Sequence, residues 1–199
     1  MPRAGINRRG LRKELAVKLG PFFKKELQKK VKRDINSVVR TMLVEFNTHA
    51  ITREIEGGAG ARNISGTLGG AGNLFSFIGF DEGDKPVPPV RQILERSTHL
   101  VSITQSPNSL DFEVVIQIPD KEALFDASPI PWAAARSWVA GIERGLPGLG
   151  QFLVQRGSGR SQGGVQIKGT LRGGGFSNKK YISAILNNLQ QNLLRALRR

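Results

Sequence analysis

The sequence predicts an α+β fold: a mostly antiparallel sheet packed by long N-terminal and C-terminal amphipathic helices. Two segments, 21–46 and 181–197, place apolar residues at steps of three and four, which is the period of one helix face. A third, 110–118, alternates apolar and polar residues, which is typical of a strand with one covered face. Helices at both ends with strands between them therefore indicate this class.

A long helix is predicted over residues 21–46. Its apolar face consists of Phe23, Leu27, Val31, Ile35, Val38, Met42 and Phe46. The opposite face is almost wholly cationic over its first half and holds Lys24, Lys25, Lys29, Lys30, Lys32 and Arg33. Like charges at this spacing repel, so packing or a partner must hold the helix. Gly20-Pro21 is expected to separate it from a shorter basic helix over 8–19, and residues 1–50 form a basic N-terminal helical segment.

The remaining residues, 51–199, are expected to form the α+β body. Residues 56–73 are rich in glycine and are predicted to be a loop. The segment 74–80, with the sequence LFSFIGF, is predicted to be a short apolar strand. A turn and a proline-rich connector over 81–89 lead into a short helix over 90–96.

Two strands, 99–105 and 110–118, are predicted to be joined by Ser106-Pro107-Asn108-Ser109. In the second strand, the apolar side chains on one face are Leu110, Phe112, Val114, Ile116 and Ile118. Asp111, Glu113 and Gln117 point the other way, and only Val115 breaks the alternation. The pattern predicts a sheet with one covered face and one face that meets water or a partner.

The end of the body is expected to contain a short helix over 132–144 and two strands, 151–155 and 165–168, around a second glycine-rich loop, 156–175. The C-terminal helix is placed within 178–197. Its apolar stripe consists of Ile182, Ile185, Leu186, Leu189, Leu193 and Leu197. Because each fully buried large side chain stabilises by ~1.5 to 3 kcal/mol, this stripe predicts a packed helix rather than a loose tail.

The net charge of +14 is unevenly distributed along the 199 residues. Residues 1–40 hold 13 Lys and Arg against 3 Asp and Glu, 41–155 hold 8 against 13, and 156–199 hold 9 against none. Two cationic ends therefore flank a mildly acidic body. Such ends favour contact with nucleic acid or with an acidic protein surface. Alternatively, the basic faces only keep the protein soluble. This role explains less well why the C-terminal segment contains no Asp or Glu.

Catalytic chemistry has little support in the sequence. With no cysteine, disulfides, Cys-based metal sites and a cysteine nucleophile are excluded. Phosphate-binding, dinucleotide-binding, serine-hydrolase and zinc-protease motifs are missing. His49 and His99 are expected at a helix end or the surface, and carboxylate pairs such as Glu54/Glu56 are expected to be solvated. We therefore expect no enzymatic activity, no cofactor and no metal; a hydrolase using an unrecognised carboxylate cleft is the third alternative considered.

Long apolar segments are missing as well. No stretch approaches the ~18 apolar residues of a spanning helix, and the polar, Arg-rich start has no apolar stretch of a signal peptide after it. We expect a soluble protein without a membrane partner.

The basic ends could bind phosphate backbones without reading sequence, because flexible, basic, glycine-rich segments do so. The candidate partner-facing or DNA-facing residues are Arg8, Arg9, Arg12, Lys13, Lys24, Lys25, Lys29, Lys30, Arg156, Arg160, Lys168 and Arg172. Stacking platforms are nearly absent, since the chain has one Tyr and no RNP-like aromatic motif. A nonspecific nucleic-acid-binding protein is therefore the alternative to an assembly protein.

Four segments carry a family resemblance. They are the basic helix 12–46, the T-G-x-L-like Ser65-Gly66-Thr67-Leu68, the run from Trp138 to Gly145 (WVAGIERG) with its Glu-x-Gly-like step, and the C-terminal helix. In this order they resemble the tail-completion and neck proteins of tailed bacteriophages. The stretch ARNISGTLGGAGNLFSFIGF is also similar to structural proteins of contractile-tailed phages.

The resemblance implies a virion protein, assembled in the host cytoplasm, that joins the head connector to the tail. It implies a ring of six or twelve copies without a cofactor, with connector, tail or tail-terminator proteins as partners and with DNA passing through the lumen. A tail terminator is the alternative within the virion. Charge segregation also suits head-to-tail contacts between identical subunits. The candidate subunit-interface residues are Leu74, Phe75, Phe77, Trp132 and Trp138, with core packing as the alternative role of the two tryptophans.

Overall fold

The computed structural model describes residues 8–68, 72–145, 152–154, 164–166, 177 and 179–198. Helices and antiparallel strand pairs make up an α+β fold with a long N-terminal helix, which confirms the predicted class. The helices are α1 (Arg8–Thr48), α2 (Ala50–Glu56), the short 3₁₀ helix η1 (Gly58–Gly60), α3 (Leu74–Ile78), α4 (Val87–Arg96), α5 (Lys121–Asp126), α6 (Trp138–Arg144) and α7 (Ile182–Leu197). The strands are β1 (His99–Gln105), β2 (Phe112–Gln117), β3 (Pro129–Ile130), β4 (Ala133–Ser137), β5 (Phe152–Val154) and β6 (Gly164–Gln166).

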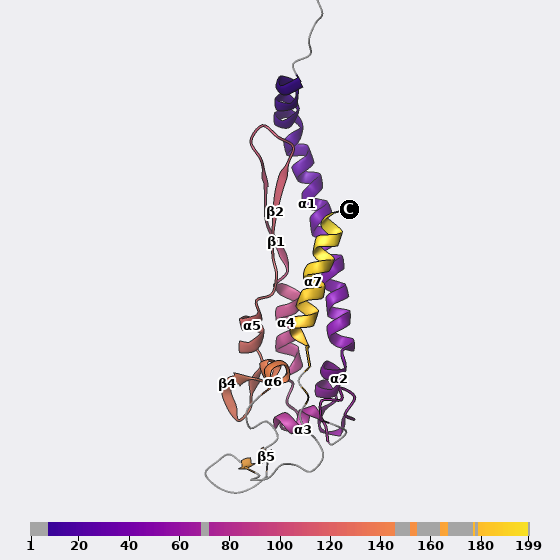
Figure 1. The fold of residues 1–199 in the computed structure, drawn as a ribbon, viewed down its shortest axis with the longest axis vertical. Coiled ribbons are helices and arrows are strands. Elements are labelled where there is room, and N and C mark those ends of the chain that lie inside the picture. The colour runs from indigo at the N-terminus through magenta and orange to yellow at the C-terminus, as the bar shows by residue number, and fades with distance from the viewer. Residues whose placement is uncertain are drawn as a thin grey trace, which may run out of the picture.

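The molecule is elongated, with two regions of different character (Figure 1). The region that we call the base comprises the described residues of 34–98, 119–145 and 177–193. The region that we call the arm comprises residues 8–33 of α1 and the β1–β2 hairpin, 99–117, which extends beside α1 away from the base (Figure 1). The strands pair as β1–β2, β3–β4 and β5–β6, each antiparallel.

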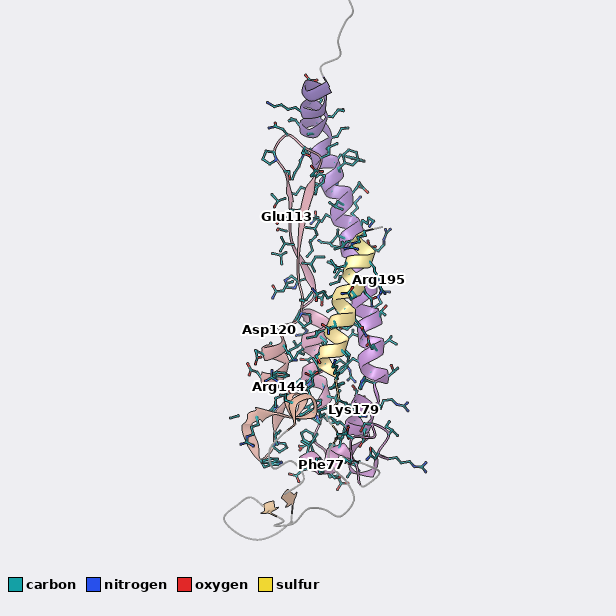
Figure 2. All side chains as sticks on the ribbon, in the orientation of Figure 1. Phe77, Glu113, Asp120, Arg144, Lys179 and Arg195 are labelled. Atoms are coloured by element: carbon teal, nitrogen blue, oxygen red, sulfur yellow. The ribbon has the colours of Figure 1, made fainter. Side chains whose placement is uncertain are left out.

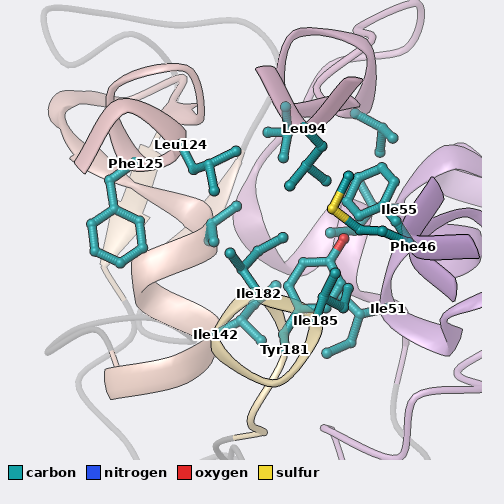
Figure 3. Close-up of a cluster of buried hydrophobic side chains, with 14 of the residues drawn as sticks. Phe46, Ile51, Ile55, Leu94, Leu124, Phe125, Ile142, Tyr181, Ile182 and Ile185 are labelled. Carbon is teal, nitrogen blue, oxygen red and sulfur yellow. The ribbon is translucent and has the colours of Figure 1, made fainter. Parts of the chain in front are cut away.

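The hydrophobic core lies mainly in the base, reaches Val31 in the arm, and takes residues from both 1–50 and 51–199. Helix α7 packs along α1 and buries Ile182, Ile185, Leu189 and Leu193, as its stripe predicts. Figure 3 shows Phe46 of α1, Tyr181 just before α7, Ile185 within α7 and Leu124 of α5 converging on this core. The aromatic rings of Phe46 and Tyr181 stack with their centroids 6.1 Å apart.

The break predicted at Gly20-Pro21 is wrong, because α1 runs without interruption through both residues. Gly20 is a place of close packing: a Cβ there would lie 2.3 Å from Oε1 of Gln105. The Gln105 amide also donates a hydrogen bond to the Ala16 carbonyl at 3.0 Å. The hairpin thus packs against α1 in the turn just before Pro21. This turn would otherwise be weak, because proline has no N–H to donate to the helix.

The strand predicted over 74–80 is also wrong, since Leu74–Ile78 form the helix α3. Asn73 caps its N-terminus by accepting the Ser76 N–H at 2.9 Å, and Gly79 ends it with a left-handed φ of 90°. These are ordinary start and stop residues of a helix. The sequence did not distinguish a helix from a strand here, because a short apolar run is compatible with a buried helical turn as well as with a strand.

The helix predicted over 132–144 begins only at Trp138. Residues Ala133–Ser137 form β4 and pair with β3 instead. Ser137 is the N-cap of α6 and accepts the Ala140 N–H at 3.1 Å. The helices α2 and α5 were not predicted; they are capped by His49 and Asp120, respectively.

Several predictions are confirmed. The hairpin strands form as β1 and β2, and the predicted strands 151–155 and 165–168 correspond to β5 and β6. The helix predicted over 90–96 forms but begins earlier, at Val87. Of the glycine-rich loops, 56–73 includes η1 and the buried Thr67, whereas 156–175 lies outside the described residues apart from Gly164–Gln166.

Candidate interaction surfaces

The arm exposes far more apolar surface than the base. The large exposed hydrophobic residues of the arm are Leu15, Val17, Leu19, Phe22, Phe23, Val101, Leu110 and Val115. Phe22 is 61% exposed, and its ring meets that of Phe23 edge-on at 5.8 Å between centroids. Several exposed large apolar side chains on one part of a molecule favour an interaction site there. The arm is therefore the first candidate for a functional surface.

The hairpin has one face on α1 and one face in solvent, as the alternation predicts. Leu100, Ile103, Val114 and Ile116 are buried or half-buried on the inner face. Gln105 fastens the far end of the hairpin, since its amide donates to the Ala16 carbonyl at 3.0 Å and to the Ser109 carbonyl at 2.8 Å. An isolated two-stranded hairpin is marginal in water, so α1 supplies its support.

The outer face of the hairpin is open. Its exposed cross-strand pairs are His99 with Gln117, Ser102 with Val115, and Thr104 with Glu113. The register shifts between Leu100 and Ser102, so that Val101 is an extra residue in β1, and it is 55% exposed. Val115, 42% exposed, is the residue that breaks the alternation in the sequence. That break was the one sequence signal for an apolar patch on this face.

A groove of about 800 Å³ runs between α1 and the tip of the hairpin. Its lining residues are Phe23, Glu26, Leu27, Lys29, Lys30, Arg33, Leu110 and Phe112. The floor is apolar and the rim is cationic. Of these residues, sequence reasoning selected Lys29 and Lys30 as candidates but missed Phe23, Leu110 and Phe112, because it assigned them to the covered faces of their elements.

The groove cations have partners on α1 itself. The Lys29 ammonium lies 2.9 Å from the Glu26 carboxylate, and the Lys30 ammonium lies 3.0 Å from that of Asp34. The hydrogen bond and charge of Lys29 lower the pKa of Glu26. The Arg33 guanidinium is 3.8 Å from Asp34 and its side chain is 77% exposed. Arg33 thus leaves most of its donor surface open.

The predicted basic residues divide into those on α1 and those elsewhere. Arg8, Arg9 and Arg12 belong to the first turns of α1. Lys13, Lys24, Lys25 and Lys29 are exposed along the arm, and Lys30 is half-buried. Arg156, Arg160, Lys168 and Arg172 lie outside the described residues.

The predicted subunit-interface residues need correction. Leu74, Phe75 and Trp138 are buried in the core of the base, with Trp138 only 1% exposed, so these side chains have no surface to offer a partner. Phe77 and Trp132 are half-buried and pack against the same core. The Trp132 indole N–H donates to the Ile78 carbonyl at 2.6 Å. Leu74, Phe75 and Trp138 therefore pack the core, and only Phe77 and Trp132 keep part of their surface exposed.

Two buried carboxylates organise the base. Glu54 is fully buried, and its oxygens accept the Ser65 N–H at 2.8 Å and the Leu74 N–H at 2.7 Å. Ser65 opens the T-G-x-L-like segment, so this carboxylate ties that segment and α3 to α2. The expectation that Glu54 is solvated is therefore wrong.

Glu143, in the Glu-x-Gly-like step, has the same role at the start of α7. Its carboxylate accepts the Ser183 N–H at 2.6 Å and lies 3.0 Å from the Lys121 ammonium. Burial opposes ionisation, but the Ser183 hydrogen bonds and Lys121 outweigh it and lower the pKa of Glu143. Both carboxylates therefore bind backbone N–H groups at the starts of helices. Both lie in or against segments that carry the family resemblance.

Tyr181 joins these elements at the centre of the base. Its hydroxyl is 2.6 Å from Thr52 Oγ1, and burial raises its pKa. The His49 ring lies 4.8 Å from the Tyr181 ring, and its Nδ1 accepts the Ile51 N–H at 3.3 Å. Desolvation lowers the pKa of His49, against the smaller opposite effect of Glu45. His49 is a helix-capping residue, as expected, and His99 is exposed on β1.

Among the residues that the structure describes, no group of three or more His, Asp or Glu side chains could hold a metal ion. Within the same ranges, no helix is both long and apolar enough to cross a membrane.

Comparisons with known proteins return nothing: no family model, no curated protein and no solved structure matches the chain. The resemblance to phage neck proteins therefore stays a prediction that depends on the short motifs.

Proposed function

We propose that this protein is a structural subunit of a tailed-bacteriophage neck, a tail-completion component that forms a ring of six or twelve copies and joins the head connector to the tail. Tail terminator is the alternative position within the same virion. The adjacent connector and tail proteins are its partners, and DNA passes through the lumen of the ring.

The observation that carries this proposal is the contrast in solvent exposure between arm and base. Among the described side chains, the base buries most of its large apolar residues, with Val44 and Ile64 as exceptions, and satisfies its internal carboxylates, whereas the arm leaves eight large hydrophobic residues exposed beside a cationic helix. A surface of this kind gains free energy when a neighbouring subunit covers it. Assembly therefore explains why the chain extends an arm that its own core does not cover.

The motifs behind the resemblance give a second line of support. Ser65 binds Glu54, Thr67 accepts the Ser177 N–H at 2.8 Å, and Ile142 accepts the Lys179 N–H at 3.1 Å. The motif segments, distant in sequence, are thus joined around the start of α7. They supply a rigid base, and the arm supplies the surface for assembly.

The experiment is a mass measurement on purified protein, combined with a search for the protein in purified virions. We expect a closed oligomer of six or twelve copies in solution and the protein at the head-tail junction of particles. A strictly monomeric protein that is absent from particles would contradict the proposal.

A nonspecific nucleic-acid-binding protein is the second candidate, favoured by the exposed lysines along α1, among them Lys13, Lys24 and Lys25. Duplex binding should then weaken steeply with salt, with a log–log slope of about −0.9 per phosphate neutralised. Undetectable duplex binding at low salt would remove this candidate.

A further inference from the structure

We infer that the groove of the arm is the receptor for the outer face of the β1–β2 hairpin of a second copy of this chain. The inference rests on the proposed ring and deepens it, because it names the two surfaces that meet. One copy contributes Phe23, Leu27, Arg33 and the hairpin tip; its neighbour contributes Val101, Glu113 and Val115.

Charge complementarity favours this occupant. Residues 8–33 hold eleven Lys and Arg against two Glu, whereas the hairpin, 99–117, holds Asp111 and Glu113 and neither Lys nor Arg. Glu113 is exposed on the outer face opposite Thr104, and Figure 2 shows it on the hairpin, far from the base where Phe77 lies. Arg33, on the groove rim and 77% exposed, is the matching cation. Opposite charges across a contact fix its register and exclude wrong partners.

The apolar side chains of the two surfaces also match. The groove floor contains Phe23, Leu27, Leu110 and Phe112. The outer face of the hairpin presents Val101 and Val115, of which Val101 is the extra residue at the bulge. A bulge changes the direction in which side chains leave a strand, and bulges are common where a strand meets a partner or a site. The two valines therefore form a small apolar knob beside a carboxylate.

The position of the two surfaces favours a closed ring. Phe112 lines the groove, and its neighbour in β2, Glu113, lies on the outer face of the hairpin. One of these adjacent residues therefore belongs to the receptor surface and the other to the surface that binds the next copy. Because these two residues are adjacent, the groove and the outer face of the hairpin lie at about the same height along the arm. A rotation about an axis parallel to the arm brings the hairpin of one copy to the groove of the next without a shift along the axis. Heterologous contacts of this kind close into rings.

Phosphate is a weaker occupant for this groove. Lys29 and Lys30 already pair with Glu26 and Asp34, and Glu26 itself lines the groove. An apolar floor with an acid in its wall suits a protein face that brings one carboxylate rather than a polyanion.

The test is a pair of charge reversals, Glu113→Arg on the hairpin and Arg33→Glu on the groove, studied by sedimentation and native mass spectrometry of the full chain. Each variant alone should dissociate, with an apparent dissociation constant at least tenfold above that of the wild type. An equimolar mixture should reassemble, because every contact in an alternating ring then pairs opposite charges. Glu95→Arg, the same charge change on an exposed residue of α4, should assemble like the wild type.

The outcomes distinguish failure of the inferred contact from failure of the proposed ring. Variants that assemble like the wild type, or a mixture that does not reassemble, would overturn the contact and leave the ring standing. A mixture that reassembles only to a dimer would support the contact and contradict the six- or twelve-membered ring. A monomeric wild type contradicts both. Duplex DNA that binds at low salt through Arg33 and leaves assembly of the wild type unchanged would identify phosphate as the occupant of the groove and overturn the inference.

Discussion

The base and the arm differ in the solvent exposure of their aromatic and charged side chains. In the base, Trp138 and Tyr181 are buried, and the carboxylates of Glu54 and Glu143 accept backbone N–H groups. In the arm, Phe22 and Val101 are more than half exposed, and ion pairs such as Lys29–Glu26 lie in solvent. The proposed function explains the difference: the base is stable within one chain, and a neighbouring copy covers the arm. The predictions below test this contrast.

Truncation of an aromatic side chain should produce the largest difference in stability between the base and the arm. Trp138→Ala opens a cavity in the core of the base and should lower the free energy of unfolding by about 3–5 kcal/mol. Phe22→Ala, on the exposed arm, should change it by less than about 0.5 kcal/mol. Urea unfolding, measured on monomeric protein at low concentration, checks both values. Equal losses would contradict the division into base and arm.

Removal of the Glu54 carboxylate should have the next largest effect. Glu54→Ala leaves the N–H groups of Ser65 and Leu74 without their acceptor, and a loss of about 2–4 kcal/mol is expected. Glu56→Ala is the matched control, because Glu56 is exposed and its ion pair with Arg91 contributes less than about 1 kcal/mol. Thermal or urea unfolding of the two variants provides the comparison. If Glu56→Ala were the more damaging change, the role assigned to Glu54 would be wrong.

A local effect is expected at the contact between arm strands and helix. Gln105→Ala removes the hydrogen bonds to the Ala16 and Ser109 carbonyls and should reduce global stability by only about 1 kcal/mol. Amide hydrogen exchange should nevertheless speed up throughout 99–117 and remain unchanged in the base. Thr104→Ala, on the exposed face, serves as the control. Unchanged exchange in the hairpin would show that Gln105 does not fasten it.

The smallest effect concerns pH. The folded protein has a lowered pKa at His49, below the ordinary value of 6.5, so the unfolded chain binds this proton more readily. The stability that depends on neutral His49 is present above about pH 6.5 and is lost as the pH falls through the folded pKa. His49→Asn keeps a capping oxygen but cannot titrate, and it should flatten the pH dependence of the unfolding midpoint in this range. Glu143 adds a further loss only below its ordinary pKa of 4.5. An identical slope in both proteins would contradict the role of His49.

Periodicity predicted the long elements because their patterns extend over many residues. The apolar stripe of α7 and the alternation of β2 each repeat often enough to identify the element and its buried face. The short elements were harder. In α3, the start and stop signals Asn73 and Gly79 flank a run too short to show a period. Gly20, a residue type that ordinarily weakens a helix, leaves room for the side-chain amide of Gln105, which lies 85 positions further along the chain.

The interaction surfaces were only partly predictable for the same reason. Cationic residues such as Lys29 are visible as a run in the sequence, and Val115 is visible as a break in alternation. Whether an apolar residue is covered depends on contacts between distant segments. Trp138 is buried by such contacts, whereas Phe23, on the arm, is 42% exposed. Side chains of similar chemistry thus have opposite roles that no local pattern distinguishes.

The central claim is that the arm mediates assembly while the base folds without it, and one measurement tests it most directly. Sedimentation of the wild type should be compared with that of Val115→Lys, which places on the exposed outer face of the hairpin a charge of the same sign as the groove rim. We predict a closed oligomer for the wild type and a monomer for the variant, with the same unfolding midpoint when both are diluted to monomers. A variant that assembles like the wild type, or a wild type that is monomeric at every concentration, would contradict the claim.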